Sequence, residues 1–343
     1  MARCVFRDGT IIEDYGRPYV VSEINSSHNG NIDVAKQMID ASVEIGCDCV
    51  KFQSWSVESL YSKTYYDSNP IAKRFVKKFA LDASQLKELA DYCLAKRISF
   101  SSTPYSEEEV DFLVSECDVP YIKIASMEVN NPKFLEYIGN KHVPIVLSTG
   151  MSSYEEVDFA ISVLKKCGVT DMVILHCVSI YPTELGTVNL NNIIGLRERY
   201  PEYPIGFSDH TEGDAAAVAS VALGAGLIEK HLTLDHTKVG MDNGMATEPE
   251  AFKNLVDKCR SIQIAMGSKV RSVSDAEMNQ RKNMRRSLIV TRDIPKGTII
   301  SESDLSAKRP GTGFPPTCID RVIGKRAVRD IVSDTVIVPE DIE

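Results

Sequence analysis

The sequence predicts a (β/α)8 TIM barrel followed by a small β-rich domain. Three observations lead to this prediction. Eight short apolar runs alternate with amphipathic stretches, polar residues gather where these runs end, and the composition changes after about residue 268. A doubly wound open sheet is the alternative for such an alternation, but no GxGxxG follows the first run, so the barrel is favoured.

The apolar runs have the length and composition of buried strands, and the stretches between them have apolar residues at helical spacing. IDVAKQMIDASVEIG, which follows the first run, is an example of this helical spacing. The predicted strands are 19–24, 49–54, 99–104, 121–126, 144–149, 172–177, 204–209 and 227–232. Eight strand–helix units within about 250 residues match the size of this barrel class.

The composition divides the chain into three parts. Residues 1–268 hold the predicted barrel, and residues 269–284 form a highly charged linker. Residues 285–343 alternate short β-rich runs with Pro, Gly and Asp turns, which predicts a second compact domain. A domain this small is expected to rely on the barrel or on a second subunit for stability.

Composition and charge exclude several classes of function. Apolar residues make up 43% and charged residues 25%, as in an ordinary folded protein. The 39 basic residues against 48 acidic ones give a net charge of −9, which argues against a nucleic-acid-binding protein. No apolar run approaches the roughly 20 residues that span a bilayer. The first residues show no signal-peptide core. The nine cysteines include no CxxC pair. We therefore expect a cytoplasmic protein with reduced thiols and no membrane partner.

Two lysines lie within predicted strands, Lys51 in VKFQ and Lys123 in IKIAS. Because a buried lysine is costly without an anion, they indicate a phosphate or carboxylate ligand. There are two alternatives: one of the lysines reaches solvent at the rim, or one forms a Schiff base as in aldolases of this fold. Four hydroxyl side chains are placed to complete the hydrogen bonds of such an anion: Thr103, Ser126, Ser148 and Ser208.

Two histidines belong to the last two predicted strand ends: His210 directly follows the seventh strand, and His231 lies on the eighth. Since neighbouring strands are about 4.8 Å apart, two imidazoles at one height can hold a divalent cation. Either histidine alone is more commonly a hydrogen-bonded core residue, and the metal interpretation depends on the pair.

Four acidic residues lie near the predicted strand ends or in the loop before the last helix. Carboxylates beside a metal and an anionic substrate act as a general base, bind hydroxyls or orient other ligands. The sequence leaves these roles open, and for Asp242 in the loop GMDNGMATEP a turn-forming role is an equal alternative. The four residues are Glu23, Glu128, Glu229 and Asp242.

Nine segments carry a resemblance to a known family. In chain order they are SEINSSHNG, VKFQ, FSSTPY, IKIASMEVNN, LSTGM, LHCVSIYPT, IGFSDHT, IEKHLTLD and KRPGTG. Together they resemble the motifs of the sialic acid synthases over essentially the whole chain, including a C-terminal antifreeze-like domain that begins near RRSLIV. That family condenses phosphoenolpyruvate with an acylamino sugar to make nine-carbon 2-keto acids, and it forms domain-swapped homodimers.

The resemblance implies a role for individual residues. Phosphoenolpyruvate would be held by Lys51, Thr103, Lys123, Ser126, Ser148 and Ser208, with a shorter or water-mediated contact from Ser179, where many members have asparagine. A divalent metal, Mn²⁺ or Mg²⁺, would be bound by His210 and His231, with Glu23 close to the metal's water. The sugar site would be lined by Gln53, Tyr105, Glu128, Tyr181, Glu229 and Asp242. Arg309 in KRPGTG would reach the sugar's acylamino group from the antifreeze-like domain of the second subunit.

Several departures from the family pattern fall around the expected sugar site. Ser27 replaces an asparagine of the usual ExGxNHNG opening, Asn243 stands where a histidine is frequent, and Ala125 and Met127 flank Ser126 where glycines are common. The acceptor therefore stays open between N-acetylmannosamine, its 6-phosphate and a 6-deoxy-2,4-diacetamido hexose. A free sugar is expected, because no second cluster of cations is present for another phosphate.

Two other functions are alternatives to the synthase activity that the resemblance implies. A pyruvate-dependent aldolase with a lysine imine would need no metal and would release no phosphate. A non-enzymatic carbohydrate-binding protein or scaffold would give no purpose to two histidines and two lysines inside the barrel.

Overall fold

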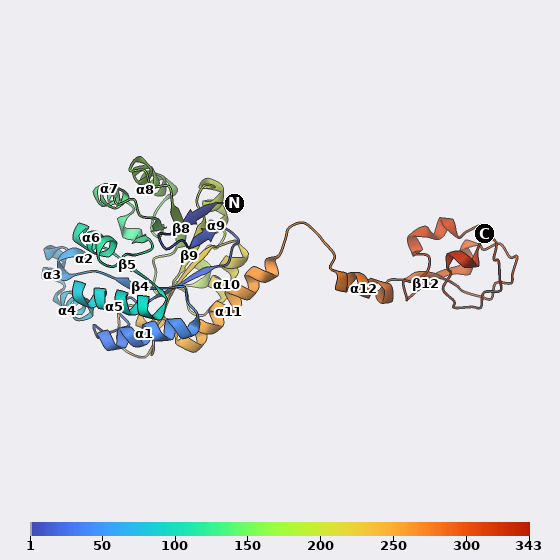
Figure 1. Ribbon diagram of the computed structural model, residues 1–343, viewed down its shortest axis with the longest axis horizontal. Coiled ribbons are helices and arrows are strands. Elements are labelled where there is room, and N and C mark those ends of the chain that lie inside the picture. Colours follow the sequence, from blue (N-terminus) through green and yellow to red (C-terminus); the bar gives the residue numbers. More distant parts are fainter. Residues whose placement is uncertain (1) are drawn as a thin grey trace. The chain divides into compact units, whose positions relative to one another are not determined.

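The structure is a computed structural model and describes residues 2–343. Its residues form two compact units, one ending at Gly267 and the other comprising Ser268–Glu343. In Figure 1 the first unit runs from blue to orange and the second from orange to red.

The first unit is built on an eight-stranded parallel sheet that curves into a nearly closed barrel. The strand order is β5-β4-β3-β10-β9-β8-β7-β6, so β5 and β6 form its two ends. The strands are β3 (Tyr19–Glu23), β4 (Cys49–Gln53), β5 (Ser99–Thr103), β6 (Ile122–Ile124), β7 (Ile145–Ser148), β8 (Met172–Cys177), β9 (Ile205–Asp209) and β10 (Leu227–His231). The predicted TIM barrel is thereby confirmed, because each strand lies within or overlaps a predicted run.

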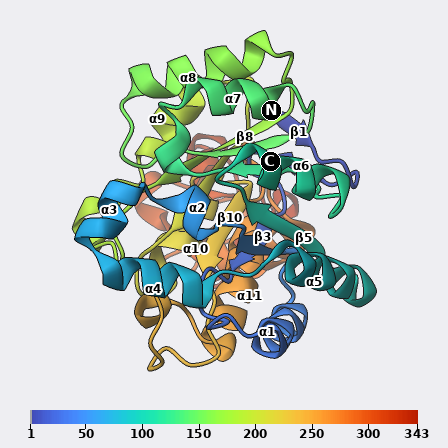
Figure 2. The same cartoon turned by 90° about the vertical axis from the view of Figure 1, so that its left-hand side faces the viewer.

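Helices follow the strands and cover the outside of the barrel (Figure 2). They are α1 (Ile32–Ile45), α5 (Ala83–Lys96), α6 (Glu107–Ser115), α7 (Pro132–Gly139), α8 (Tyr154–Lys166), α9 (Asn192–Arg199), α10 (Ala215–Ala222) and α11 (Pro249–Met266). Their apolar faces and the outward-facing strand residues form one large core, which includes Val50, Ile174 and Phe252. None of the helices in residues 2–343 combines the length and apolarity that a membrane crossing needs.

Local signals explain where the helices begin and end. Asn31 accepts a hydrogen bond from the N–H of Asp33 at the start of α1, and Gly46 ends this helix with a φ of 86°. Glycine adopts this left-handed conformation without the strain that a side chain would add. Capping boxes built on Asp82 and Ser153 start α5 and α8.

The register of the strands brings polar and charged side chains to two successive levels of the barrel, because Glu229 pairs with Val21, two residues before Glu23. Glu23 is opposite His231 on one side and Lys51 on the other. On the next pair of strands Ser208 is opposite Glu229. Since alternate residues of a strand face the same side, these five side chains point into the barrel together.

An N-terminal hairpin, which the sequence patterns did not predict, precedes the barrel. It consists of β1 (Arg3–Val5) and β2 (Ile11–Glu13), paired antiparallel. Cys4, Phe6 and Ile12 form a second core cluster with inward-facing residues from the N-terminal parts of the strands. The hairpin therefore covers the barrel at the end where the strands begin.

Three short helices between β4 and α5 were also not predicted. They are α2 (Val57–Leu60), α3 (Lys63–Ser68) and α4 (Pro70–Phe79). Their buried side chains Tyr66, Val76 and Phe79 form a small separate cluster with Trp55, which precedes α2. Because this segment follows the C-terminal end of β4, it adds a wall to that face of the barrel.

The second unit has its own small core. Its regular elements are α12 (Asp275–Met284), β11 (Ser287–Val290) and β12 (Leu305–Lys308), and the two strands pair antiparallel. Isolated bridges, such as Ile294 with Ile331, join the remaining extended segments. The core residues are Leu288, Val290, Ile294, Ile300, Val322, Ala327, Ile331 and Ile337. The charged segment 269–284, predicted as a linker, thus contains a ten-residue helix.

The shorter 3-10 turns complete the list of elements. They are η1 (Ser126–Glu128), η2 (Leu185–Thr187), η3 (Asn243–Met245), η4 (Glu302–Asp304), η5 (Pro316–Arg321) and η6 (Pro339–Asp341).

One buried histidine of the first unit, His28, has a consequence for stability. It lies in the loop after β3, is 2% exposed, and its Nδ1 accepts a hydrogen bond from the N–H of Gly30 at 3.0 Å. Burial lowers the pKa of His28 to about 4. The unfolded chain therefore binds a proton between about pH 6.5 and pH 4 that the folded protein excludes, and stability falls as the pH is lowered through this range.

We expect His28 alone to reduce the free energy of unfolding by about 2 kcal/mol between pH 7 and pH 5. The variant His28→Asn retains an acceptor for the Gly30 N–H but does not titrate. Urea unfolding at both pH values is expected to show a loss about 2 kcal/mol smaller in this variant than in the wild type. Equal losses in the two proteins would contradict the prediction.

Candidate active site

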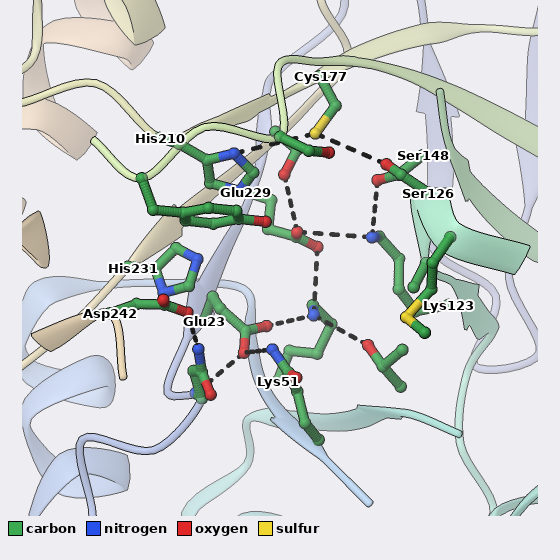
Figure 3. Close-up of a pocket in the computed structure, with 18 of the residues that line it drawn as sticks. Glu23, Lys51, Lys123, Ser126, Ser148, Cys177, His210, Glu229, His231 and Asp242 are labelled. Carbon is green, nitrogen blue, oxygen red and sulfur yellow. Dashed lines mark hydrogen bonds and ion pairs between the residues drawn. The ribbon is translucent and has the colours of Figure 1, made fainter. Parts of the chain in front are cut away.

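A cavity of about 320 Å³ lies at the C-terminal ends of the barrel strands, where this class of barrel places its active sites (Figure 3). All eight barrel strands contribute side chains to it. The residues singled out from the sequence that line it are Glu23, Lys51, Gln53, Thr103, Tyr105, Lys123, Ser126, Ser148, Ser179, Tyr181, Ser208, His210, Glu229, His231 and Asp242. The structure therefore brings the two lysines and the two histidines into one cavity.

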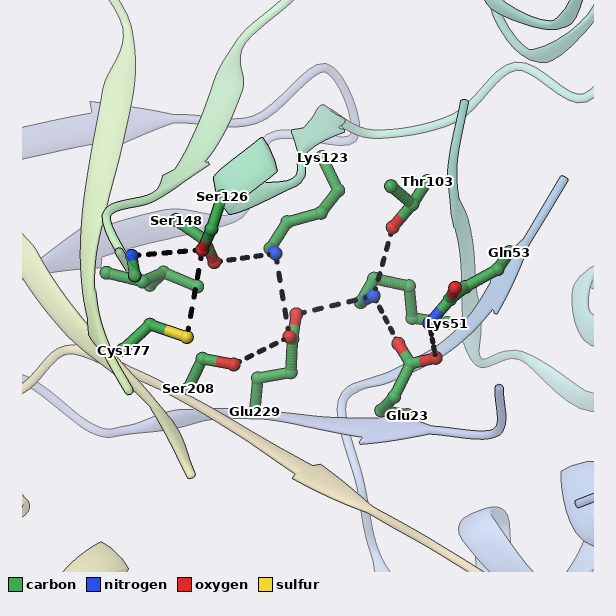
Figure 4. A network of polar contacts seen from close by, with 12 residues as sticks. Glu23, Lys51, Gln53, Thr103, Lys123, Ser126, Ser148, Cys177, Ser208 and Glu229 are labelled. Carbon is green, nitrogen blue, oxygen red and sulfur yellow. Dashed lines mark hydrogen bonds and ion pairs between the residues drawn. The ribbon is translucent and has the colours of Figure 1, made fainter. Parts of the chain in front are cut away.

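Two lysines and two glutamates alternate at the bottom of the cavity (Figure 4). Lys51 Nζ makes a short ion pair with Glu23 and lies 3.6 Å from Glu229 Oε2. Lys123 Nζ lies 3.6 Å from Oε1 of the same Glu229 carboxylate. All four side chains are almost completely buried. The arrangement leaves Lys123 with a more distant carboxylate than Lys51.

Hydroxyl groups complete this network. Lys51 Nζ donates to Thr103 Oγ1 at 3.1 Å, and Lys123 Nζ donates to Ser148 Oγ at 2.8 Å. Ser208 donates to Glu229 Oε1 at 2.9 Å. Three of the four hydroxyls that the sequence pointed to are thus within hydrogen-bonding distance of a charged group of the network.

The protonation of the network follows from burial and from charge. Burial disfavours ionisation of Glu229, but Lys123 and Lys51 outweigh it and hold the pKa of Glu229 below its ordinary value. Burial, together with repulsion from Glu229, raises the pKa of Glu23. Burial also lowers the pKa of Lys123, although the nearby charge of Glu229 acts in the opposite direction and raises it. An anion bound next to Lys123 would favour its charged form, and of the two network glutamates Glu23 is the better suited to take up a proton.

The two histidines face each other across the cavity with ring centroids 5.4 Å apart. His210 Nδ1 lies 2.8 Å from the carbonyl oxygen of Val178, which holds the ring in place. Tyr181 packs against His210 at a centroid distance of 4.2 Å. Burial, together with the charge of His210, lowers the pKa of His231, so His231 is neutral and offers a nitrogen lone pair.

The donor set of this pair fits a divalent cation with open coordination positions. The contact with Val178 uses one ring nitrogen of His210, and the other becomes a ligand when the cation displaces the proton of the charged ring. His231 makes no hydrogen bond through its ring within residues 2–343, so one of its nitrogens is available as well. In the same part of the chain, no group of three or more His, Cys, Asp or Glu side chains is arranged as a metal site. A cation held here would therefore complete its coordination with water or substrate oxygens.

Gly150, directly after β7 in the motif LSTGM, leaves room for its neighbours in the cavity. Its N–H donates to Ser126 Oγ at 3.0 Å. A Cβ atom at this position would lie 2.2 Å from Ser179 Oγ and 2.8 Å from Ser126 Oγ. Both distances are far below van der Waals contact, so the two serines keep their positions only because residue 150 is glycine.

Two residues singled out from the sequence do not line the cavity. Glu128 ends the turn η1 and accepts a hydrogen bond from Asn131 Nδ2 at 2.8 Å. Burial raises the pKa of Glu128. Arg309 belongs to the second compact unit of the chain.

Other cavity residues were not singled out from the sequence. Cys177 ends β8 with its Sγ 3.9 Å from His210 Nδ1. Strand alternation could have indicated that Cys177 faces the cavity, because the neighbouring His176 faces outward. His176 Nε2 lies 2.7 Å from the carbonyl oxygen of Val188. The remaining ones come from loops and from the α2 segment: Asn25, Trp55, Leu60, Tyr61, Met151 and Met241. Ala125 and Met127, which the sequence showed as departures from the family pattern, also line the cavity.

Comparison with family models gives two matches that cover most of the chain. Residues 38–271 match the NeuB family, and residues 285–343 match the SAF domain. The chain belongs to the NeuB family. The SAF match confirms the small antifreeze-like domain expected after the barrel, and the family confirms the resemblance read from the nine motifs.

Relatives of this NeuB family member are similar over nearly their whole length. It is 35% identical to the N,N′-diacetyllegionaminic acid synthase of Legionella pneumophila, over 95% of this chain and 94% of the relative. It is 32% identical to the human N-acetylneuraminate-9-phosphate synthase, over 94% of this chain and 92% of the relative. Among solved structures, the N-acetylneuraminic acid synthetase of Leptospira borgpetersenii in complex with citrate matches with a TM-score of 0.75 at 29% identity, over 81% of this chain and 96% of that chain.

Proposed function

We propose that this NeuB family member is a nonulosonic acid synthase that condenses phosphoenolpyruvate with an N-acylamino hexose and releases phosphate. The observation that carries the proposal is the cavity in which Lys51 and Lys123, with their hydroxyl partners, face the pair His210 and His231. The relatives named as legionaminic and N-acetylneuraminate-9-phosphate synthases support the same class of reaction.

The proposed reaction joins carbon 3 of phosphoenolpyruvate to the aldehyde carbon of the open-chain sugar. Water adds at carbon 2, and the resulting hemiketal phosphate loses inorganic phosphate by cleavage of the C–O bond. Lys51 and Lys123 balance the charges of the phosphate and carboxylate groups, and Ser148 and Thr103 orient these lysines. Glu23, whose pKa is raised, takes the proton of the attacking water.

The metal proposed for this site is Mn²⁺ or Mg²⁺, held by His210 and His231. Such an ion supplies Lewis-acid polarisation of the aldehyde oxygen. Two nitrogen ligands suit Mn²⁺ better than Mg²⁺, which prefers oxygen ligands throughout.

The acceptor is proposed to be a sugar without a phosphate group. Lys51, Lys123 and the histidine pair are the basic side chains among the described residues that line the cavity, and they are already assigned. The neutral remainder of the lining includes Leu60, Tyr61, Met127, Met151 and Met241. Such a lining suits the N-acetyl and deoxy groups of N-acetylmannosamine or of a 6-deoxy-2,4-diacetamido hexose. It offers no partner for a 6-phosphate.

Gln53, Tyr105, Tyr181 and Asp242 are proposed to bind the hydroxyl and amide groups of this sugar. Tyr105 already donates to Gln53 Oε1 at 2.7 Å, so the two act together. For Arg309 we propose contact with the acylamino group in the neighbouring subunit of a domain-swapped homodimer. This last assignment rests on the resemblance of the KRPGTG motif.

An assay with a panel of sugars tests the proposed function. The purified protein is incubated with phosphoenolpyruvate, Mn²⁺ and each of the three acceptors, and phosphate release and product mass are measured. We expect one phosphate per product with an unphosphorylated acceptor and little turnover of the 6-phosphate. Consumption of pyruvate without phosphate release would instead support the lysine-imine aldolase.

Replacing Gly150 by alanine is expected to raise the KM for phosphoenolpyruvate at least about tenfold, because the new methyl group displaces Ser126 and Ser179. Gly186→Ala is the matched control, since a Cβ there meets no atom within 4 Å. Steady-state kinetics of both variants, with phosphoenolpyruvate as the varied substrate, measure this change in KM. Equal KM values in the two variants would show that these serines are not part of the anion site.

A further inference from the structure

A buried ion pair lies on the outer side of the barrel, directly behind the two histidines. Lys230 of β10 and Asp209 of β9 are opposite each other in the register, and their side chains are 1% and 0% exposed. Lys230 Nζ lies 2.8 Å from Asp209 Oδ2. Asp209 precedes His210 and Lys230 precedes His231, but alternation along the strands turns the ion pair away from the cavity.

This ion pair holds the backbone on one side of His210. Asp209 Oδ1 accepts a hydrogen bond from the N–H of Thr211 at 2.9 Å, and Lys230 Nζ donates to the carbonyl of Thr211. The carbonyl of His210 itself accepts a hydrogen bond from the N–H of Thr183 at 2.9 Å. The backbone that carries the His210 ring is therefore fixed by side-chain charges that never reach the cavity.

A buried ion pair contributes little net stability, because the lost hydration offsets the attraction, and apolar residues of similar volume commonly replace it without loss. Here the hydrogen bonds of the pair end on Thr211, next to a cavity histidine. We propose that Asp209 and Lys230 are positioning residues that set His210 for binding of the divalent cation and for turnover. The part that concerns turnover rests on the proposed function.

The double variant D209N/K230M tests this role. It removes both charges together, keeps an acceptor for the Thr211 N–H and retains most of the side-chain volume, but loses the donor to the Thr211 carbonyl. We expect kcat to fall about tenfold or more, while the KM for phosphoenolpyruvate changes less than about twofold, because Lys51 and Lys123 are unaffected. Binding of Mn²⁺ to the metal-free protein, followed by the EPR signal of the free ion, is expected to weaken about tenfold.

A second ion pair at the opposite end of the same strand provides the matched control. Asp14 and Arg197 lie 3.2 Å apart, and Asp14 Oδ1 accepts a hydrogen bond from the N–H of Ile205, the first residue of β9. The variant D14N/R197M is expected to lower the melting temperature but to leave kcat and Mn²⁺ binding unchanged.

Wild-type kcat and Mn²⁺ binding in folded D209N/K230M would overturn the proposal. If that variant does not fold, the variant K230R tests the positioning role instead. It keeps the ion pair but puts the wider guanidinium group into a fully buried site. A loss of kcat at constant KM in K230R supports positioning, and wild-type kcat and Mn²⁺ binding overturn it. Absence of condensation by the wild-type protein would contradict the proposed function alone, and the Mn²⁺ measurement would then decide this inference.

Discussion

Replacing Lys123 with alanine is expected to reduce kcat/KM for phosphoenolpyruvate at least about 10³-fold. Lys123 is 4% exposed, and its nearest carboxylate, that of Glu229, is 3.6 Å away. Its charge is therefore only partly balanced by the protein and is available to the anion. Loss of this charge leaves Glu229 facing the substrate with Lys51 as its one remaining lysine, so the substrate is repelled as well as less well held. Steady-state kinetics with phosphoenolpyruvate as the varied substrate measure the effect.

Ser148→Ala is the control for the Lys123 variant. It removes the hydrogen bond that orients Lys123 but leaves the charge, so a loss of about tenfold is expected. Wild-type kinetics in Lys123→Ala would refute the anion site. Trapping of Lys123 by borohydride in the presence of pyruvate would show instead that this lysine forms an imine.

Removal of the divalent cation is expected to abolish condensation, with a loss of at least about 10³-fold. Treatment with EDTA should inactivate the wild-type protein, and added Mn²⁺ should restore it. His231→Ala should be inactive with or without Mn²⁺, because His231 supplies one of the two facing imidazoles. Phosphate release and Mn²⁺ binding by EPR measure both effects.

The exposed His142, changed to asparagine, is the control for the histidine variant, and it should keep wild-type activity. Asparagine tolerates the positive φ of 53° at this position better than alanine does. Full activity of the wild-type protein after exhaustive chelation would contradict a metal-dependent reaction and would leave the two histidines to act as acid and base.

The residues of the cavity that could be predicted from the sequence share one property. Lys51, Lys123 and Glu229 lie on strands, where alternation fixes the side to which a side chain points. An ionisable residue inside an apolar run is then conspicuous, because its burial requires a partner. For this reason the sequence alone indicated that the two lysines, Glu229 and His231 share one site.

The parts of the site that lie outside the strands were harder to predict from the sequence. The α2–α4 segment supplies Leu60 and Tyr61 to the cavity. Its helices are short and are interrupted after Leu60 and at Asn69, so no helical period extends far enough to be recognised. The strands of the N-terminal hairpin have three residues each, which is too short for alternation to be distinguished from chance. Glu128 was expected at the sugar, but its position depends on the turn η1, which propensity does not fix.

The N-terminal hairpin has a consequence for kinetics. Cys4, Phe6 and Ile12 close the base of the barrel with apolar side chains, so substrates enter and leave through the opposite mouth. Lys51 and Lys123 lie deep in that single passage, whereas the methionines and Tyr61 lie nearer its exposed end. For the proposed reaction, we therefore expect the enol phosphate to bind before the sugar, because a sugar that binds first would obstruct its co-substrate. If the proposed reaction takes place, this architecture predicts compulsory-order kinetics with substrate inhibition by excess sugar.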